Sequence, residues 1–387
     1  MKALLFERKV AKYAAAAVAG RFAAGRGATV GPLSLTDIDE PELPNEDWVR
    51  VRPRLAGICG SDLATIDGHS SRYFEPIVSF PFVPGHEVVG ELDDGSRVVL
   101  VPILTCAVRG VEPLCPQCAA GRANRCERIA FAGHTHLEPG LQTGFCESTG
   151  GGWSLAFVAH PSQLVPVPEH LTDEEAVLIE PTACAVHAAR SVRPDGAGDV
   201  AVIGAGTLGL LTVAALRSFG HVDSIVVAAK HPAQRDLARE LGASQVVAPN
   251  ELARVVRART RSMVVGAQLT NGAATVADCV GSDDSLEQAL SIVAPGGDIV
   301  LLGMPGGTTS IDLTSLWHRE SVLRGCYAYT PEDFTDATAL VADAGLGRLV
   351  SATYPLARYR EAIDHAANAG RRGAVKIAFD LRTERGR

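Results

Sequence analysis

A glycine motif between an apolar run and a helical pattern is the feature that most limits the fold of this 387-residue chain. Gly204, Gly206 and Gly209 follow the apolar run 199–203 and, with Thr207 and Leu208 between them, lead into a helical pattern at 210–218. In that setting the three glycines allow a tight turn, close approach of a phosphate, and close helix packing, respectively. The motif predicts a parallel βαβ unit that binds a dinucleotide. Glycines of a simple turn are the alternative.

The rest of this half repeats the alternation of strand and helix. An acidic helix start at 172–175 is followed by apolar runs at 224–227, 277–280 and 297–302 with helical stretches between them. We therefore expect a Rossmann-type, doubly wound parallel sheet over residues 171–321. Ligands bind at the carboxyl ends of such strands, so Val280, Gly303 and Met304 are expected to border the nicotinamide, unless the glycines there serve only turns.

The first 170 residues have a different character. They are rich in Gly and Pro, with short β-type runs at 48–51, 97–101 and 164–167, which predicts a mainly β domain over 1–170. The β character returns at 325–329 and 374–379, so the tail 322–387 is expected to rejoin this domain. An α/β chain of two domains fits the length, because single cores stop growing well below it.

Charge and cysteine usage exclude several functional classes. The net charge is −8 and the basic residues are dispersed, which argues against a nucleic-acid partner. There is no run of about 18 apolar residues and no signal peptide, so we expect a cytoplasmic protein without a membrane partner. The nine cysteines are an odd number in a long chain, which favours metal ligation over a disulfide framework.

Two short segments carry ligand-type residues, Cys59 within 57–62 and His86 within 84–87. Taken alone, Cys59 and His86 are each explained equally well as an ordinary core or surface residue. Together with Glu180-Pro181 and the glycine motif, in this order, they resemble the zinc-containing medium-chain dehydrogenases of the alcohol dehydrogenase superfamily. The resemblance covers nearly the whole chain and is strongest in the sorbitol, glucose and threonine dehydrogenase branch.

That resemblance implies a GroES-like, mainly β catalytic domain joined to the Rossmann-type domain. It also implies hydride transfer between NAD(P) and a secondary alcohol, polyol, sugar-like or amino alcohol, in a homodimer or homotetramer. Cys59, His86 and Glu180 would bind a catalytic zinc whose open position activates the substrate oxygen. Glu87 resembles the neighbouring glutamate of the family, which either ligates zinc directly or exchanges with Glu180.

The same resemblance assigns the proton path. Ser61 would take the proton of the substrate hydroxyl. Asp62 would hydrogen-bond to the zinc ligands without binding the metal itself. Many relatives carry a histidine five residues after the cysteine ligand, where this chain has Ala64. The relay would then end on ribose hydroxyls and water, or on His69.

A cluster of four cysteines resembles the family's structural zinc lobe, at about 104–128. The family's usual spacing, with two and then seven residues between successive cysteines, is kept by Cys115, Cys118 and Cys126. Between Cys106 and Cys115, however, there are eight residues where relatives have two. The cost of closing a loop grows slowly with its length, so a four-cysteine zinc site is still expected. Reduced or partly lost ligands are the alternative.

The choice of nicotinamide depends on the end of the second strand. Enzymes that use NAD usually place an acid there, but Asp223 precedes the run 225–227 and lies at the wrong end. Lys230 and Arg235 lie at the right end, where cations can pair with a 2′-phosphate. NADP(H) is therefore expected ahead of NAD(H), unless these two are solvated helix-start charges.

Two other functions compete with this interpretation. A zinc-independent quinone or enoyl reductase of the same superfamily would share the glycine motif but lack Cys59, His86 and the cysteine cluster. A nonenzymatic protein that binds zinc and a nucleotide would need none of the relay residues. An alcohol oxidation assay discriminates between these possibilities.

Overall fold

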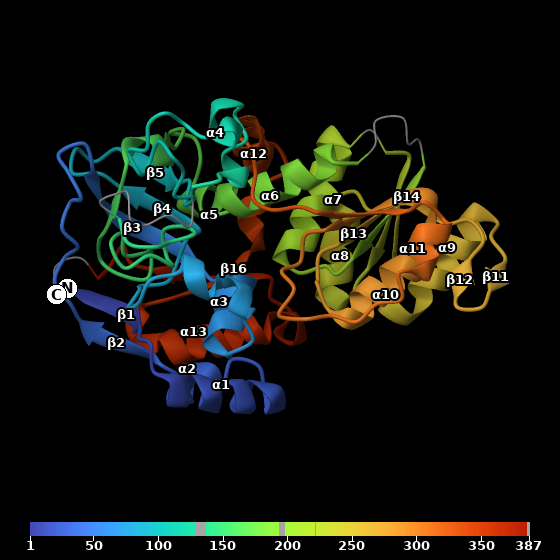
Figure 1. Ribbon diagram of the computed structural model, residues 1–387, viewed down its shortest axis with the longest axis horizontal. Coiled ribbons are helices and arrows are strands. Elements are labelled where there is room, and N and C mark those ends of the chain that lie inside the picture. The colour runs from blue at the N-terminus through green and yellow to red at the C-terminus, as the bar shows by residue number, and fades with distance from the viewer. Residues whose placement is uncertain (129–136, 193–197, 221, 385–387) are drawn as a thin grey trace. The chain divides into compact units, whose positions relative to one another are not determined.

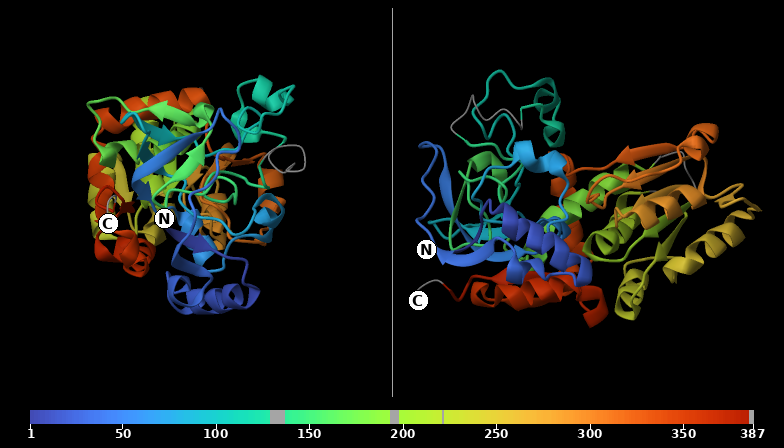
Figure 2. Two further views of the ribbon diagram at one scale, coloured as in Figure 1. Left: turned by 90° about the vertical axis from the view of Figure 1, so that its left-hand side faces the viewer. Right: turned by 60° about the horizontal axis from the view of Figure 1, so that its bottom comes forward.

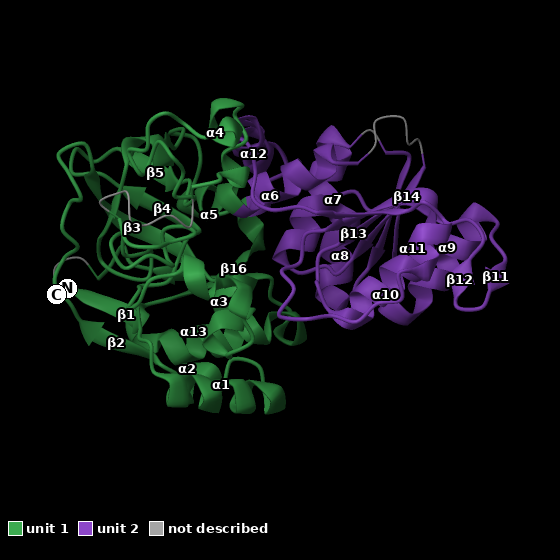
Figure 3. Cartoon of the chain, viewed as in Figure 1, with its two compact units in different colours: residues 1–180, 347–387 green, residues 181–346 purple. Residues whose placement is uncertain are grey.

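The computed structural model describes residues 1–128, 137–192, 198–220 and 222–384. The chain forms two compact units, coloured separately in Figure 3. Unit 1 comprises Met1–Glu180 and Gly347–Arg387, and unit 2 comprises Pro181–Leu346. Among the described residues, none of the helices combines the length and the apolar character needed to cross a membrane.

Unit 1 contains a mainly antiparallel sheet in the order β16-β17-β3-β4-β5-β7, with β6 paired to β3 and a separate pair β1-β2 (Figure 1). Its strands are β1 (Lys2–Phe6), β2 (Leu33–Asp37), β3 (Val49–Gly57), β4 (Val88–Glu91), β5 (Arg97–Leu100), β6 (Phe157–Ala159), β7 (Leu164–Pro166), β16 (Val350–Tyr354) and β17 (Lys376–Asp380). Its helices are α1 (Val10–Phe22), α2 (Gly27–Val30), α3 (Gly60–Ile66), α4 (Pro116–Ala119), α5 (Asp173–Ala176) and α13 (Tyr359–Ala367). This agrees with the expected mainly β domain.

Helices α1 and α2, which follow β1 and precede β2, were not predicted from the sequence. The alanine run 14–17 favours a helix, and Figure 2 shows α1 and α2 in blue beside the red α13. The buried carboxylate of Asp67 accepts hydrogen bonds from the backbone amides of Gly25 at 2.7 Å and Gly27 at 2.8 Å. Asp67, the residue after α3, therefore anchors the segment that carries α1 and α2.

Unit 2 is a parallel sheet in the order β10-β9-β8-β13-β14-β15, which is the doubly wound order of a Rossmann fold. Its strands are β8 (Asp199–Ile203), β9 (Ser224–Ala228), β10 (Gln245–Val247), β13 (Ala273–Asp278), β14 (Val293–Leu301) and β15 (Val322–Gly325), with a hairpin β11 (Val264–Val265) and β12 (Gln268–Leu269). Its helices are α6 (Ile179–Arg190), which begins in unit 1, α7 (Thr207–Phe219), α8 (Pro232–Glu240), α9 (Leu252–Thr260), α10 (Asp283–Ile292), α11 (Thr314–His318) and α12 (Pro331–Asp343).

The second boundary lies at Leu346/Gly347 rather than at the predicted 321/322. β15 pairs in parallel with β14 and completes the sheet of unit 2. In α12, Asp333 accepts hydrogen bonds from His187 and Arg190 of α6, both at 2.7 Å. These contacts keep residues 322–346 in unit 2, so only the later part of the tail rejoins unit 1.

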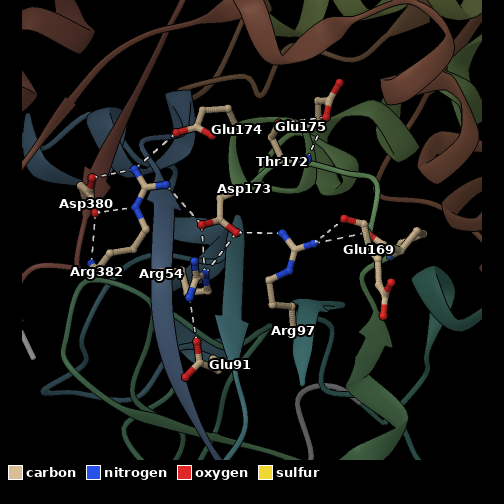
Figure 4. A network of polar contacts seen from close by, with 11 residues as sticks. Arg54, Glu91, Arg97, Glu169, Thr172, Asp173, Glu174, Glu175, Asp380 and Arg382 are labelled. Atoms are coloured by element: carbon tan, nitrogen blue, oxygen red, sulfur yellow. Dashed lines mark hydrogen bonds and ion pairs between the residues drawn. The ribbon is translucent and has the colours of Figure 1, made fainter. Parts of the chain in front are cut away.

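A buried carboxylate joins the tail to the rest of unit 1 (Figure 4). Asp173, in the first turn of α5, is 5% exposed and lies between three arginines from different segments. Its oxygens are 2.9 Å from Arg54 Nε in β3, 3.1 Å from Arg97 Nη1 in β5, and 3.2 Å from Arg382 Nη1 after β17. One acidic side chain therefore links two strands of the sheet to the returning tail.

We expect Asp173→Asn to lower the free energy of unfolding by about 3 kcal/mol, because it leaves three partly buried guanidinium groups without their shared charge. Urea unfolding followed by circular dichroism measures this. Asp93→Asn is the matched control, since its exposed ion pair with Arg52 should contribute less than about 1 kcal/mol. Equal effects of the two substitutions would contradict a structural role for the network.

Candidate active site and metal centres

Three ligand-type side chains meet where β3 ends and β4 begins. Antiparallel pairing places Ala56 of β3 opposite Val88 of β4, so Cys59, just after β3, lies close to His86 and Glu87, just before β4. The ligand atoms of these three side chains all lie within 4.8 Å of one another. A thiol, an imidazole and a carboxylate are the donors that zinc takes in proteins, so this group is suited to hold that ion.

Asp62 connects two of these side chains. Its Oδ2 accepts a hydrogen bond from the backbone amide of Cys59 at 2.9 Å, and its Oδ1 lies 3.5 Å from His86 Nδ1. Burial lowers the pKa of His86, but the Asp62 carboxylate and Cys59 outweigh it and raise that pKa well above its usual value. With Nδ1 facing Asp62, the other ring nitrogen of His86 is available to a metal.

Glu87 has a buried cation as its partner. Lys376 of β17 is 2% exposed, forms an ion pair with Glu87, and donates a hydrogen bond to the Ile58 carbonyl at 3.1 Å. The pair lies against Gly57, where an added Cβ would be 2.2 Å from Glu87 Oε2. Only glycine at position 57 leaves room for this arrangement.

Glu180 is not a member of the group formed by Cys59, His86 and Glu87 among the described residues. It is buried in the first turn of α6 and is the last residue of unit 1. Ser61 lies in α3, one residue before Asp62, and is half-buried. His69 is exposed after the end of α3.

A second group consists of four cysteines whose sulfur atoms lie within 4.8 Å of one another: Cys106, Cys115, Cys118 and Cys126. All four are free thiols, and the Sγ atoms of Cys106 and Cys126 are 3.7 Å apart, far beyond a disulfide bond. Four sulfurs placed tetrahedrally at the usual zinc–sulfur distance would be about 3.8 Å apart. The cluster therefore fits a tetrahedral zinc ion despite the longer first loop.

Backbone amides favour the thiolate form of Cys115. The amide of Cys118 donates to Cys115 Sγ at 3.4 Å from the start of α4. Burial opposes ionisation of Cys115, but this amide and that of Glu127 outweigh burial and lower the pKa of Cys115 to about 6. A thiolate is the form that binds a metal.

In unit 2, the glycine motif has the expected geometry between β8 and α7. Gly204 has a φ of 93°, and a Cβ on Gly209 would be 2.1 Å from the Gly204 carbonyl oxygen. A Cβ on Gly206 would meet nothing within 4 Å, so the outer face of the loop is open. Thr207 and Leu208 form the first turn of α7, where the backbone amides at a helix start can bind an anion such as a phosphate.

The carboxyl ends of β13 and β14 approach each other closely. A Cβ on Gly303 would be 2.3 Å from the Val280 carbonyl carbon, so these two backbone segments pack directly together. The buried carboxylate of Asp278 accepts the amide of Val280 at 2.9 Å. Val280 is 48% exposed and Met304 is half-buried, so both side chains can contact a ligand.

The carboxyl end of β9 has no carboxylate at positions 228–231. Lys230 is exposed there. Arg235 of α8 donates to the Ala229 carbonyl at 2.8 Å and to the Lys230 carbonyl at 3.4 Å. These hydrogen bonds hold the Arg235 guanidinium beside the end of the strand.

Comparison with known proteins agrees with this geometry. Residues 45–169 match the alcohol dehydrogenase GroES-like domain, and residues 207–343 match the zinc-binding dehydrogenase domain. Over 328 residues the chain is 30% identical to "Probable D-xylulose reductase A" of Arthroderma otae, covering 82% of this chain and 85% of the relative. This chain belongs to the zinc-containing medium-chain dehydrogenases of the alcohol dehydrogenase superfamily.

Two further relatives support the assignment. L-galactonate-5-dehydrogenase of Escherichia coli K12 is 26% identical over 334 residues, covering 83% of this chain and 88% of the relative. An NADP-bound zinc-binding dehydrogenase structure from Sinorhizobium meliloti 1021 superposes with a TM-score of 0.73 at 25% identity, covering 92% of this chain and 98% of that chain. Like its family, this dehydrogenase is an oxidoreductase of CH–OH groups that uses zinc and a nicotinamide cofactor.

Lys376, the buried partner of Glu87, was not among the residues predicted from the sequence. Lys376 interrupts the apolar run 374–379, and a lysine in a buried strand is the signal that could have identified it. Cys146 and Trp153 are both completely buried. Trp153 donates to the Gly57 carbonyl and packs edge-on against Phe379, so it is a core residue.

The two separate ligand groups predict about two zinc ions per chain. Elemental analysis of the purified protein should give that value, and Cys118→Ser should lower it to about one. Cys184→Ser is the control, because Cys184 is in neither group and its replacement should leave the zinc content unchanged. A wild-type content near one that Cys118→Ser does not change would exclude zinc at the four cysteines.

Proposed function

We propose that this dehydrogenase oxidises a polyhydroxylated secondary alcohol to the ketone, or catalyses the reverse reaction. The convergence of Cys59, His86 and Glu87 within 4.8 Å carries the proposal, because it gives a thiol–imidazole–carboxylate site. The relatives named for xylulose and galactonate favour a substrate with several hydroxyl groups. In polyhydroxylated substrates, the hydroxyls beside the reacting carbon can fix the orientation by hydrogen bonding.

Cys59, His86 and Glu180 are the zinc ligands that we propose, with Glu87 exchanging with Glu180. The Glu87 carboxylate is already neutralised by Lys376, so it does not need a metal to be tolerated in the interior. Release from Lys376 would be required before Glu87 could bind zinc fully. Glu180 is buried in the first turn of α6 and is the last residue of the first segment of unit 1. It therefore belongs to the same unit as Cys59 and His86.

The residues of the chain supply orientation and proton transfer. When bound, zinc provides a Lewis acid that lowers the pKa of the substrate hydroxyl, and the nicotinamide accepts the hydride. Ser61 is proposed to take the proton, since among the described residues its hydroxyl forms no hydrogen bond, while Thr65 donates to its carbonyl at 2.9 Å. Asp62 keeps Cys59 and His86 in position. From Ser61 the proton would pass to ribose hydroxyls and water, or to the exposed His69.

The four cysteines are proposed to hold a structural zinc. Their sulfur spacing fits a tetrahedron, and the site has no open position for a substrate when all four ligands bind. Cys106 and Cys115 are almost completely buried. This ion would therefore stabilise the lobe and take no part in hydride transfer.

The proposed cofactor is NADP(H) in preference to NAD(H). Positions 228–231 carry no carboxylate that would repel a 2′-phosphate, and Lys230 is free in solvent to approach one. Arg235 is held close by through its bonds to the backbone.

His86→Ala should lower turnover on the order of a thousandfold or more, because the Lewis acid is lost, while reduced cofactor still binds. We would test a panel of polyols, sugar acids, simple secondary alcohols and amino alcohols at the absorbance of reduced nicotinamide. Cofactor binding is followed separately by fluorescence titration. His365→Ala is the control, as the imidazole of this histidine of α13 bonds to the Tyr354 hydroxyl at 2.9 Å and His365 is in neither ligand group.

The proposal would fail if a folded, zinc-free His86→Ala protein kept the wild-type rate. Activity restricted to simple monohydric alcohols would leave the enzyme class intact and reject the polyhydroxylated substrate.

For the cofactor, we expect the wild type to have a higher kcat/KM with NADP than with NAD. Lys230→Ala should reduce the NADP value about tenfold and leave the NAD value nearly unchanged, because only the 2′-phosphate contact is lost. Lys12→Ala in α1, distant in sequence from unit 2, is the control for loss of a surface charge. A wild-type preference for NAD that Lys230→Ala leaves unchanged would show that this assignment is wrong.

A further inference from the structure

Asp278, the last residue of β13, has a completely buried carboxylate. Its Oδ1 accepts the backbone amides of Val280 at 2.9 Å and Gly281 at 3.1 Å, and its Oδ2 accepts the Ser285 hydroxyl at 2.9 Å. All three partners donate, which is the pattern of an ionised carboxylate. They are also neutral, so they stabilise the negative charge without cancelling it. Unit 2 therefore holds a buried anion at the carboxyl end of its sheet.

The position of this anion is fixed by the backbone. The amides of Leu302 and Gly303, at the end of β14, both donate to the Asp278 carbonyl at 2.9 Å. The carboxylate closes the turn 279–282, in which Gly281 has a φ of 76°. A Cβ on Gly281 would be 2.5 Å from the Gly303 carbonyl oxygen, so the turn packs directly on the end of β14. Asp278 thus holds the turn and the neighbouring strand end together.

The same turn contacts the glycine motif. β13 pairs in parallel with β8, and the amide of Cys279 donates to the Ile203 carbonyl at 3.0 Å. A Cβ on Gly204 would be 2.7 Å from Val280 Cγ2, so the Val280 side chain lies directly against the first glycine of the motif. Val280 is nevertheless 48% exposed, and it can therefore contact a ligand bound at this edge.

The strand order indicates which half of the cofactor lies there (Figure 1). With the pyrophosphate at the start of α7, after β8, the two halves of a dinucleotide extend to opposite sides of that strand. On one side is β9, whose end carries Lys230, the proposed partner of the adenosine 2′-phosphate. On the other side are β13 and β14. The nicotinamide ring is therefore expected beside Val280, with the Asp278 carboxylate beneath the turn.

We propose that Asp278 sets the relative affinity of this dehydrogenase for the oxidised and the reduced cofactor. The nicotinamide ring is positively charged when oxidised and neutral when reduced, so a fixed anion near it attracts only the oxidised form. When the reduced ring gives its hydride to a ketone, the same anion stabilises the cation that forms. Asp278 acts through its charge from beneath the turn. The inference rests on the proposed place of the nicotinamide at this edge.

Equilibrium binding of both cofactor forms tests this role without measuring turnover. In Asp278→Asn the amide oxygen can still accept the backbone amides, so the shape of the turn is kept and the charge is lost. We expect the dissociation constant of the oxidised cofactor to rise about tenfold and that of the reduced cofactor to change less than about twofold. Calorimetry measures the oxidised form and nicotinamide fluorescence the reduced form, with NADP and with NAD at one pH.

Asp298→Asn is the matched control. Asp298 is also completely buried, but it lies opposite Thr275, three residues before Asp278 in the register of β13 and β14. Its carboxylate is thus about 10 Å farther from the cofactor edge. This substitution should leave the ratio of the two dissociation constants unchanged.

Equal weakening of both cofactor forms in Asp278→Asn would overturn the proposal, because it would leave Asp278 only a structural role. A wild type that binds neither form would instead reject the dinucleotide site itself. If Asp278→Asn does not fold, Ser285→Ala decides, since it removes one donor and keeps the charge. The ratio should then stay at the wild-type value, and a folded Ser285→Ala protein that has lost its preference for the oxidised form would overturn the assignment.

Discussion

The register of β3 is the constraint on which the catalytic centre depends. On one side β3 pairs with β4, which brings His86 and Glu87 to the residues that follow Gly57. On the other side it pairs with β17, where Gly57 lies opposite Ala378 and Lys376 reaches Glu87. A slip of one residue on either side would turn the ligands or the lysine to the opposite face of the sheet. The metal group is thus a consequence of sheet pairing between distant segments.

The cofactor unit depends on a different constraint, the direct packing of backbone on backbone. Gly209 lies against the Gly204 carbonyl, and Gly303 lies against Val280, at distances that exclude a side chain at either glycine. Both contacts occur at the carboxyl ends of parallel strands, where a bound dinucleotide would lie. Such requirements leave a local trace in the sequence, which is why the glycine motif and the sheet could be predicted from it.

Other parts of the structure were predicted less completely from the sequence. The four cysteines could be predicted because they fall within 21 residues of sequence, and the pair Cys59 and His86 because their segments resemble those of the zinc-containing dehydrogenases. The role of Lys376 was missed, since it arises from contacts with Glu87 and Ile58, which lie far away in the chain. The end of unit 2 was predicted too early because β15 is a short edge strand, whose β character alone does not reveal which sheet it joins.

The catalytic group balances buried negative charge with a cation from outside the ligand motif. At the catalytic group the cation is Lys376, whose compact ammonium contacts the Glu87 carboxylate and the Ile58 carbonyl. A carboxylate offers a compact partner that an ammonium can match, so the ion pair is tolerated in the interior.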